Sequence, residues 1–195
     1  MIPIYHESDD ATPLTPDEQR DLIPSHISNR AELNEAEQEN IIRGQDWALR
    51  RRKPDLLSEK FVTTLHKQML GDVWRWAGAY RLSERNLGVP FYEIPIQLRQ
   101  LLGDVKAWVE MNSYSPDEIA VRFHHRLVFI HPFANGNGRH ARLMADLLIM
   151  QLGEERFSWG LASLREAGET RTQYISALKA ADQHDYAPLI VFARS

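Results

Sequence analysis

The clearest hydrophobic pattern lies in the second half of the chain. Apolar residues recur every three or four positions from Ile119 to Ile130, which places them on one face of a helix. The segment 115–118 supplies an N-cap serine, a proline at the first helical position and a capping-box glutamate. Because Pro132 disfavours helical geometry in the residue before it, this helix is predicted to end at His131.

The same periodicity predicts the other elements. The first 27 residues carry four prolines, and we interpret them as an extended arm. Two prolines and a glycine within 78–95 favour a short irregular hairpin. Helices are predicted over about residues 31–52, 61–70, 98–108, 116–131, 164–182 and 186–193. A further apolar helix with Leu143, Leu147 and Met150 follows a Gly/Asn-rich turn and is predicted to stop at Gly153. The fold class is therefore an all-α bundle with one small β excursion.

Composition narrows the class of protein. The chain has 195 residues, 43% of them hydrophobic, which is enough for one domain with a sizeable core. A net charge of -4 argues against binding to DNA. The absence of cysteine excludes disulfides, thiolate metal sites and a cysteine nucleophile. No apolar run is long enough for a membrane span and the start is not a secretory signal, so a soluble cytoplasmic protein is expected.

The candidate chemistry lies in residues 131–142, His-Pro-Phe-Ala-Asn-Gly-Asn-Gly-Arg-His-Ala-Arg, between two predicted helices. Two glycines let the backbone approach a ligand, and the N-terminus of the second helix favours an anion. Arg139 and Arg142 are three residues apart on that helix, and guanidinium groups match phosphate oxygens. His131 stands where an imidazole can accept a proton. Each part alone is common in ordinary turns, but their order within twelve residues indicates a phosphate site beside a base.

This stretch resembles the Fic signature, His-x-Phe-x-(Asp/Glu)-Gly-Asn-Gly-Arg-x-x-Arg. Every specified position matches except the acidic one, where Asn135 stands. Segments 76–81 and 187–190 are also similar to Fic proteins, and the resemblance covers about residues 40–193. The flanking sequence, including 31–37, resembles the subgroup called mobile mystery protein B. The implied fold is a Fic-type helical bundle with a small β-hairpin flap.

The resemblance implies a protein adenylyltransferase, which moves AMP from ATP to a Ser, Thr or Tyr hydroxyl of an unidentified protein target. In this reading His131 removes the hydroxyl proton, Arg139 holds the β-phosphate and Arg142 the γ-phosphate. Phe133 packs the loop onto the core. The nucleotide-binding residues implied are Asn135, Gly136, Asn137, Gly138, Arg139 and Arg142.

The family's acidic position holds Mg²⁺ (or Mn²⁺) against the phosphates. Asn135 brings an oxygen ligand without charge, which makes it a weak candidate for a metal ligand. The flap corresponds to residues 82–94 and docks the target's backbone by strand addition. Its candidate residues are Leu82, Leu87, Gly88, Val89, Phe91 and Tyr92.

Many Fic proteins carry an inhibitory helix with the pattern Ser/Thr-x-x-x-Glu-Gly/Asn. Ser28 and Glu32 fit its first part, and the resemblance implies that Glu32 pairs with Arg142 and blocks ATP. The alternative is that Asn29 and Glu32 only cap their own helix. The chain is accordingly divided into an arm (1–27), an inhibitory helix region (28–52) and a Fic catalytic core (53–195).

Two other functions stay open. The same fold could use another nucleotide or a phosphorylated donor. Alternatively, Asn135 points to a nucleotide-binding regulatory module with little catalysis. No DNA or membrane partner is expected in any of these readings.

Overall fold

The computed structural model describes residues 20–160 and 167–195. Most of the predicted arm, and the start of the helix predicted from residue 164, lie outside the described residues.

The described part is helical, which confirms the all-α class. Each predicted helix is present, with ends shifted by a few residues. The elements are α2 (Arg30–Leu49), α3 (Glu59–Leu70), the short 3₁₀ helix η1 (Phe91–Glu93), α4 (Ile94–Glu110), α5 (Pro116–Ile130), α6 (Asn137–Gln151), α7 (Ala167–Asp182) and α8 (Ala187–Arg194).

The helix that precedes the signature begins and ends where its sequence predicts. The Ser115 side chain accepts a hydrogen bond from Glu118 N–H and caps α5. At the other end His131 takes a left-handed conformation (φ 53°, ψ 59°), which stops the helix. Few non-glycine residues adopt this conformation. The chain therefore turns sharply at the signature histidine.

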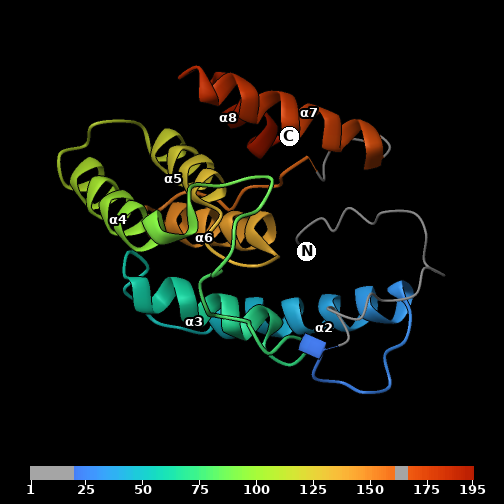
Figure 1. Ribbon diagram of the computed structural model, residues 1–195. Helices are drawn as coiled ribbons and strands as arrows, with labels where there is room; N and C mark the ends of the chain where they lie inside the picture. Colours follow the sequence, from blue (N-terminus) through green and yellow to red (C-terminus); the bar gives the residue numbers. More distant parts are fainter. Residues whose placement is uncertain (1–19, 161–166) are drawn as a thin grey trace.

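The helices form layers around α6. Figure 1 shows α5 and α6 between the pair α2–α3 on one side and the pair α7–α8 on the other, and α6 packs against α2, α3 and α5. Side chains on nearly every face of α6 are buried, from Asn137 to Ile149. This central position places the start of α6, and with it the signature loop, among several helices.

The predicted hairpin over 78–95 is wrong. The segment forms turns and bends and then passes into η1 and α4, and the β pairing recorded in the described residues is an isolated bridge between Leu22 and Trp74. The carbonyls of Ser83 and Val89 accept hydrogen bonds from the Arg81 guanidinium rather than from a partner strand. Helix α4 begins earlier than predicted because a proline is tolerated in the first turn.

No helix in the described ranges is long and apolar enough to cross a membrane.

Candidate active site

The signature loop is shaped by the side chain of Asn137. Its Oδ1 accepts the Phe133 N–H and its Nδ2 donates to the Phe133 carbonyl, both at 2.9 Å. Asn137 and Phe133 are both buried. The side-chain amide of Asn137, a residue that the sequence assigned to nucleotide binding, therefore closes the loop through both of its polar atoms.

His66 of α3 holds the loop from the other side, a role that the sequence did not reveal. Its Nδ1 accepts the Gly78 N–H (2.9 Å), so Nε2 carries the proton and donates to the Asn135 carbonyl (3.0 Å). The ring also stacks on Phe133, with centroids 3.7 Å apart. Burial, helped by the nearby charge of Arg139, lowers the pKa of His66 to about 4. Because His66 lies on the apolar face of α3, the sequence predicts that the ring is buried and hydrogen-bonded, but it does not identify the partner.

His131 itself is half-buried at the mouth of this loop. Burial lowers its pKa, and the charges of Arg81 and Arg85 act in the same direction, against the carbonyl of Val128. The imidazole is therefore neutral near pH 7 and free to accept a proton. This is the protonation state that a general base requires.

The start of α6 offers N–H groups to an anion. The first helical bond runs from His140 N–H to the Gly136 carbonyl (2.9 Å), so the N–H groups of residues 137–139 precede it. A Cβ on Gly138 would meet nothing within 4 Å, which leaves room beside this turn. The Gly136 N–H is already donated to Asn135 Oδ1 (2.7 Å). Helix N-termini with such donors favour phosphate.

Arg139 lies at this turn, but its guanidinium is engaged. Its Nη1 lies 2.8 Å from Glu37 Oε2 in α2, with 18% of the arginine and 8% of the glutamate side chain exposed. The other oxygen of Glu37 accepts the Trp74 Nε1–H (2.7 Å). The Glu37 carboxylate, which the Trp74 indole also holds, therefore contacts an arginine that the sequence assigned to phosphate binding.

Arg142, the second signature arginine, points toward α7 rather than toward α2. Arg142 is buried, and its guanidinium lies over the ring of Tyr174 in α7, 4.5 Å from the centroid. The two arginines leave one helix three residues apart, yet their guanidinium groups contact α2 and α7 respectively. The long side chains diverge because each finds a different partner, an acid for Arg139 and an aromatic face for Arg142.

Comparison with known proteins accounts for this loop. Residues 56–149 match the model of the Fic/DOC family. The chain contains a Fic/DOC family domain. A protein adenylyltransferase Fic of Drosophila mojavensis is 29% identical over 165 residues, which is 80% of this chain and 32% of the fly protein. The chain thus spans about a third of that curated relative.

Solved structures share the fold. Fic-1 from C. elegans has a TM-score of 0.63 and 27% identity, over 81% of this chain and 48% of that one. BepC of Bartonella tribocorum, a VirB-translocated effector solved with bound AMPPNP, has a TM-score of 0.67 and 18% identity, over 92% of this chain and 97% of that one. The narrower subgroup, mobile mystery protein B, remains a prediction.

The expected inhibitory contact of Glu32 is not present in the Fic domain. The Glu32 carboxylate accepts hydrogen bonds from the Ser28 N–H (2.7 Å) and hydroxyl (3.2 Å), and Asn29 caps the same turn by accepting the Glu32 N–H (3.0 Å). These backbone bonds lower the pKa of Glu32. Glu32 is thus satisfied by its own helix end, and the carboxylate that contacts a signature arginine comes from Glu37, one and a half turns further along α2.

A magnesium ion fits poorly with the residues of this loop. Asn135 is exposed, carries no charge and already accepts the Gly136 N–H through Oδ1. Within the described residues no group of three or more His, Cys, Asp or Glu side chains could hold a metal. Magnesium prefers carboxylate oxygen. Position 135 thus offers a metal ion an amide oxygen in place of a carboxylate oxygen.

The flap, residues 82–94, is an irregular segment rather than a strand pair. Leu82, Leu87 and Tyr92 are 85%, 69% and 67% exposed, whereas Val89 is buried. Gly88 has a φ of +105°, and a Cβ there would lie 2.6 Å from the Cβ of His131. The flap therefore presents apolar side chains to solvent while its backbone lies against the histidine.

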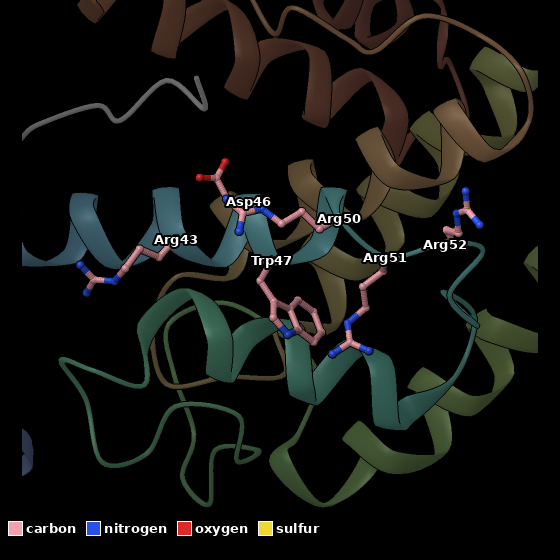
Figure 2. A pocket seen from close by; sticks show the side chains of 6 residues that line it. All are labelled: Arg43, Asp46, Trp47, Arg50, Arg51 and Arg52. Carbon is pink, nitrogen blue, oxygen red and sulfur yellow. The ribbon is translucent and has the colours of Figure 1, made fainter.

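A separate hollow of about 620 Å³ lies at the end of α2 rather than at the signature loop. Figure 2 shows its lining on the last turns of α2 and the residues that follow, with Trp47 and Arg51 on the side of α3. The Arg51 guanidinium covers one face of Trp47 at 4.1 Å, and Trp47 stacks on Phe61 with centroids 6.0 Å apart. Neither face of this indole is open to a nucleobase.

Proposed function

We propose that this chain transfers AMP from ATP to a hydroxyl group of a protein target. The observation that carries the proposal is the place of the half-buried His131, at the end of α5 and directly before the loop that opens the N-terminus of α6. The printed name of the fly relative, protein adenylyltransferase, supports this chemistry, and the AMPPNP bound by BepC supports nucleotide binding by this fold.

In the proposed step, the target's hydroxyl oxygen attacks the α-phosphorus and a new O–P bond forms. The bond between the α-phosphorus and the bridging oxygen of the β-phosphate breaks, and pyrophosphate leaves. The hydroxyl proton passes to the imidazole of His131. The N–H groups of residues 137–139 and the α6 dipole stabilise negative charge on the phosphates, so the protein acts through positioning and electrostatics.

Arg139 completes the phosphate site once its guanidinium is released. The buried Arg142 would contribute charge from the α7 side, and its contact with the γ-phosphate requires movement away from Tyr174. The exposed apolar side chains of the flap are suited to receive an extended target segment.

We further propose that α2 restrains the enzyme through Glu37. The Glu37 carboxylate accepts a hydrogen bond from Nη1 of Arg139 at 2.8 Å, which holds the guanidinium against α2, and the Trp74 indole keeps that carboxylate in place. ATP must therefore displace Glu37 before Arg139 can bind it. This assigns the inhibitory role to Glu37 instead of Glu32.

The deciding experiment compares ATP labelled on the α-phosphate with ATP labelled on the γ-phosphate. We expect label from the α-position alone to become attached to protein, and the His131→Ala variant to lose it. Transfer of the γ-label would identify a kinase and refute the proposal.

A second candidate is transfer from a different nucleotide, favoured by the uncharged Asn135. Competition of α-labelled ATP with unlabelled GTP, CTP and UTP tests it. Suppression of transfer by one of these at a lower concentration than by ATP would show tighter binding, and faster attachment of label from that nucleotide's own α-phosphate would establish it as the donor.

A further inference from the structure

Arg81 joins the flap to the signature loop through hydrogen bonds at four of its nitrogens. Its backbone N–H donates to the Pro132 carbonyl (2.9 Å) and its Nε to the His131 carbonyl (2.7 Å). Its Nη1 donates to the Ser83 carbonyl (2.9 Å) and its Nη2 to the Val89 carbonyl. One guanidinium therefore contacts the beginning of the flap, its middle and the residue that carries the imidazole.

This contact is well sheltered from solvent. The Arg81 side chain is 1% exposed, and the nearest carboxylate, Glu84, is 3.9 Å away and 61% exposed. The buried charge is thus held mainly by backbone carbonyls. Three carbonyls in three directions match the planar fork of a guanidinium, and a lysine ammonium on the same stem cannot reach them together.

The flap backbone also touches His131 directly. A Cβ on Gly88 would lie 2.6 Å from His131 Cβ, 2.7 Å from Arg81 Nη2 and 3.1 Å from the Ile130 carbonyl. No side chain can stand at this point without displacing one of its neighbours. The flap, Arg81 and the left-handed turn at His131 consequently form one closely packed unit.

We propose that Arg81 is a positioning residue that locks the flap and His131 together, so that a target segment lying on the flap is held at a fixed distance from the imidazole. The proposal rests on the proposed function, because it takes His131 as the base. All three guanidinium nitrogens of Arg81 already bond to backbone carbonyls. Arg81 acts through the carbonyl of His131 and through both halves of the flap.

Three substitutions separate geometry from charge. Arg81→Lys keeps a positive charge but loses the fork, whereas Arg81→Gln loses both. Arg85→Gln is the matched control, because Arg85 is the other cation that lowers the pKa of His131 and no hydrogen bond to the loop is recorded for it. All three variants should be compared at equal fractions folded, measured by circular dichroism.

The first measurement is chymotrypsin cleavage within the flap of the full chain, where Leu82, Leu87 and Tyr92 offer sites. Loss of the fork should open the flap, and cleavage should be roughly tenfold faster in Arg81→Lys and Arg81→Gln. Arg85→Gln should be cleaved at the parental rate. Parental cleavage of Arg81→Lys would overturn the proposal.

The second measurement is the NMR titration of the His131 ring. Removal of a nearby positive charge raises a histidine pKa, so the midpoint should move to higher pH in Arg81→Gln and Arg85→Gln. In Arg81→Lys the midpoint should stay near the parental pH while the ring resonances shift. Unchanged His131 resonances in Arg81→Lys would mean that Arg81 does not position the ring.

The third measurement is AMP transfer from α-labelled ATP. At a pH above the His131 midpoint of every variant, where the imidazole is neutral in all of them, Arg81→Lys should lower kcat with an unchanged KM for ATP, and Arg85→Gln should retain the parental kcat. If neither Arg81 variant folds, Gly88→Ala loosens the same unit from the flap side and should give the same pair of effects on cleavage and on the His131 resonances. Cleavage and NMR do not require activity, so a failure of the proposed function would leave these two results interpretable.

Discussion

The substitution Glu37→Gln asks whether α2 restrains nucleotide binding or only stabilises the fold. Glutamine keeps the size of the side chain and an amide oxygen that can still accept the Trp74 Nε1–H. It removes the negative charge that lies 2.8 Å from Arg139. A hydrogen bond to a charged group contributes roughly 1.5–3 kcal/mol, so the free energy of unfolding should fall by about 2 kcal/mol. In a chain of this size that lowers Tm by about 4–8 °C.

The same change should strengthen ATP binding. In the parent, ATP must break the contact between Glu37 and Arg139 before a phosphate reaches the guanidinium. If the roughly 2 kcal/mol needed to break the Glu37–Arg139 contact no longer opposes binding, Kd for ATP should fall about 30-fold. Calorimetric titration with a non-hydrolysable ATP analogue measures this directly, and the rate of AMP transfer should rise in parallel.

Glu32→Gln is the matched control for Glu37→Gln. It makes the same charge change on the same helix, but Glu32 is exposed and bonded only to its own helix end. It should lower Tm slightly and leave the affinity for ATP unchanged. A lower Tm in Glu37→Gln with unchanged ATP affinity would refute the restraint and leave Glu37 as a structural partner of Trp74.

Three further predictions concern the signature loop. His131→Ala should lower the rate of AMP transfer about 100- to 10,000-fold while the calorimetric Kd for ATP stays near the parental value, because the imidazole accepts the proton and does not bind the phosphates. Transfer at the parental rate would exclude His131 as the base. The pKa of His66, about 4 in the folded protein, lies below the unfolded value of about 6.5, so its contribution to stability is present above pH 6.5 and is lost as the pH falls toward 4. His66→Gln should therefore remove about 3 kcal/mol of the change in unfolding free energy over this interval, measured by denaturant titration at several pH values. Asn135→Asp should lower the Mg²⁺ concentration required for half-maximal ATP binding, and an unchanged titration would show that position 135 holds no metal.

Local signals were sufficient for most of the helices. The N-cap and proline at residues 115–116 and the proline at 132 predicted both ends of α5, because capping and the steric effect of proline act within a few residues. The hairpin over 78–95 failed for a tertiary reason. Two of its carbonyls, those of Ser83 and Val89, bond to the guanidinium of Arg81 in the same segment. That guanidinium also donates to the His131 carbonyl, 50 residues further along the chain, and this tertiary contact could not be read from local sequence.

The candidate site divides in the same way. The order of residues 131–142 was enough to indicate a base, a glycine turn and two arginines, and the family model matches this region. It could not reveal that His66, 69 residues before Asn135, holds the loop. Nor could it show that the side-chain amide of Asn137 bonds to the backbone of Phe133, because an asparagine that closes a loop and one that binds phosphate look alike in sequence.

The sequence by itself determined the helical class, the ends of the helices that carry caps, and the chemical types gathered in the signature loop, since all of these depend on neighbours within a few residues. Only the tertiary structure decided which partners those groups meet. It assigned Glu37 to Arg139, Tyr174 to Arg142, and Arg81 to both the flap and His131. Such pairings depend on the packing of helices that lie 100 or so residues apart in the chain, as for Glu37 and Arg139, and on long side chains whose direction is chosen by burial and charge rather than by local sequence.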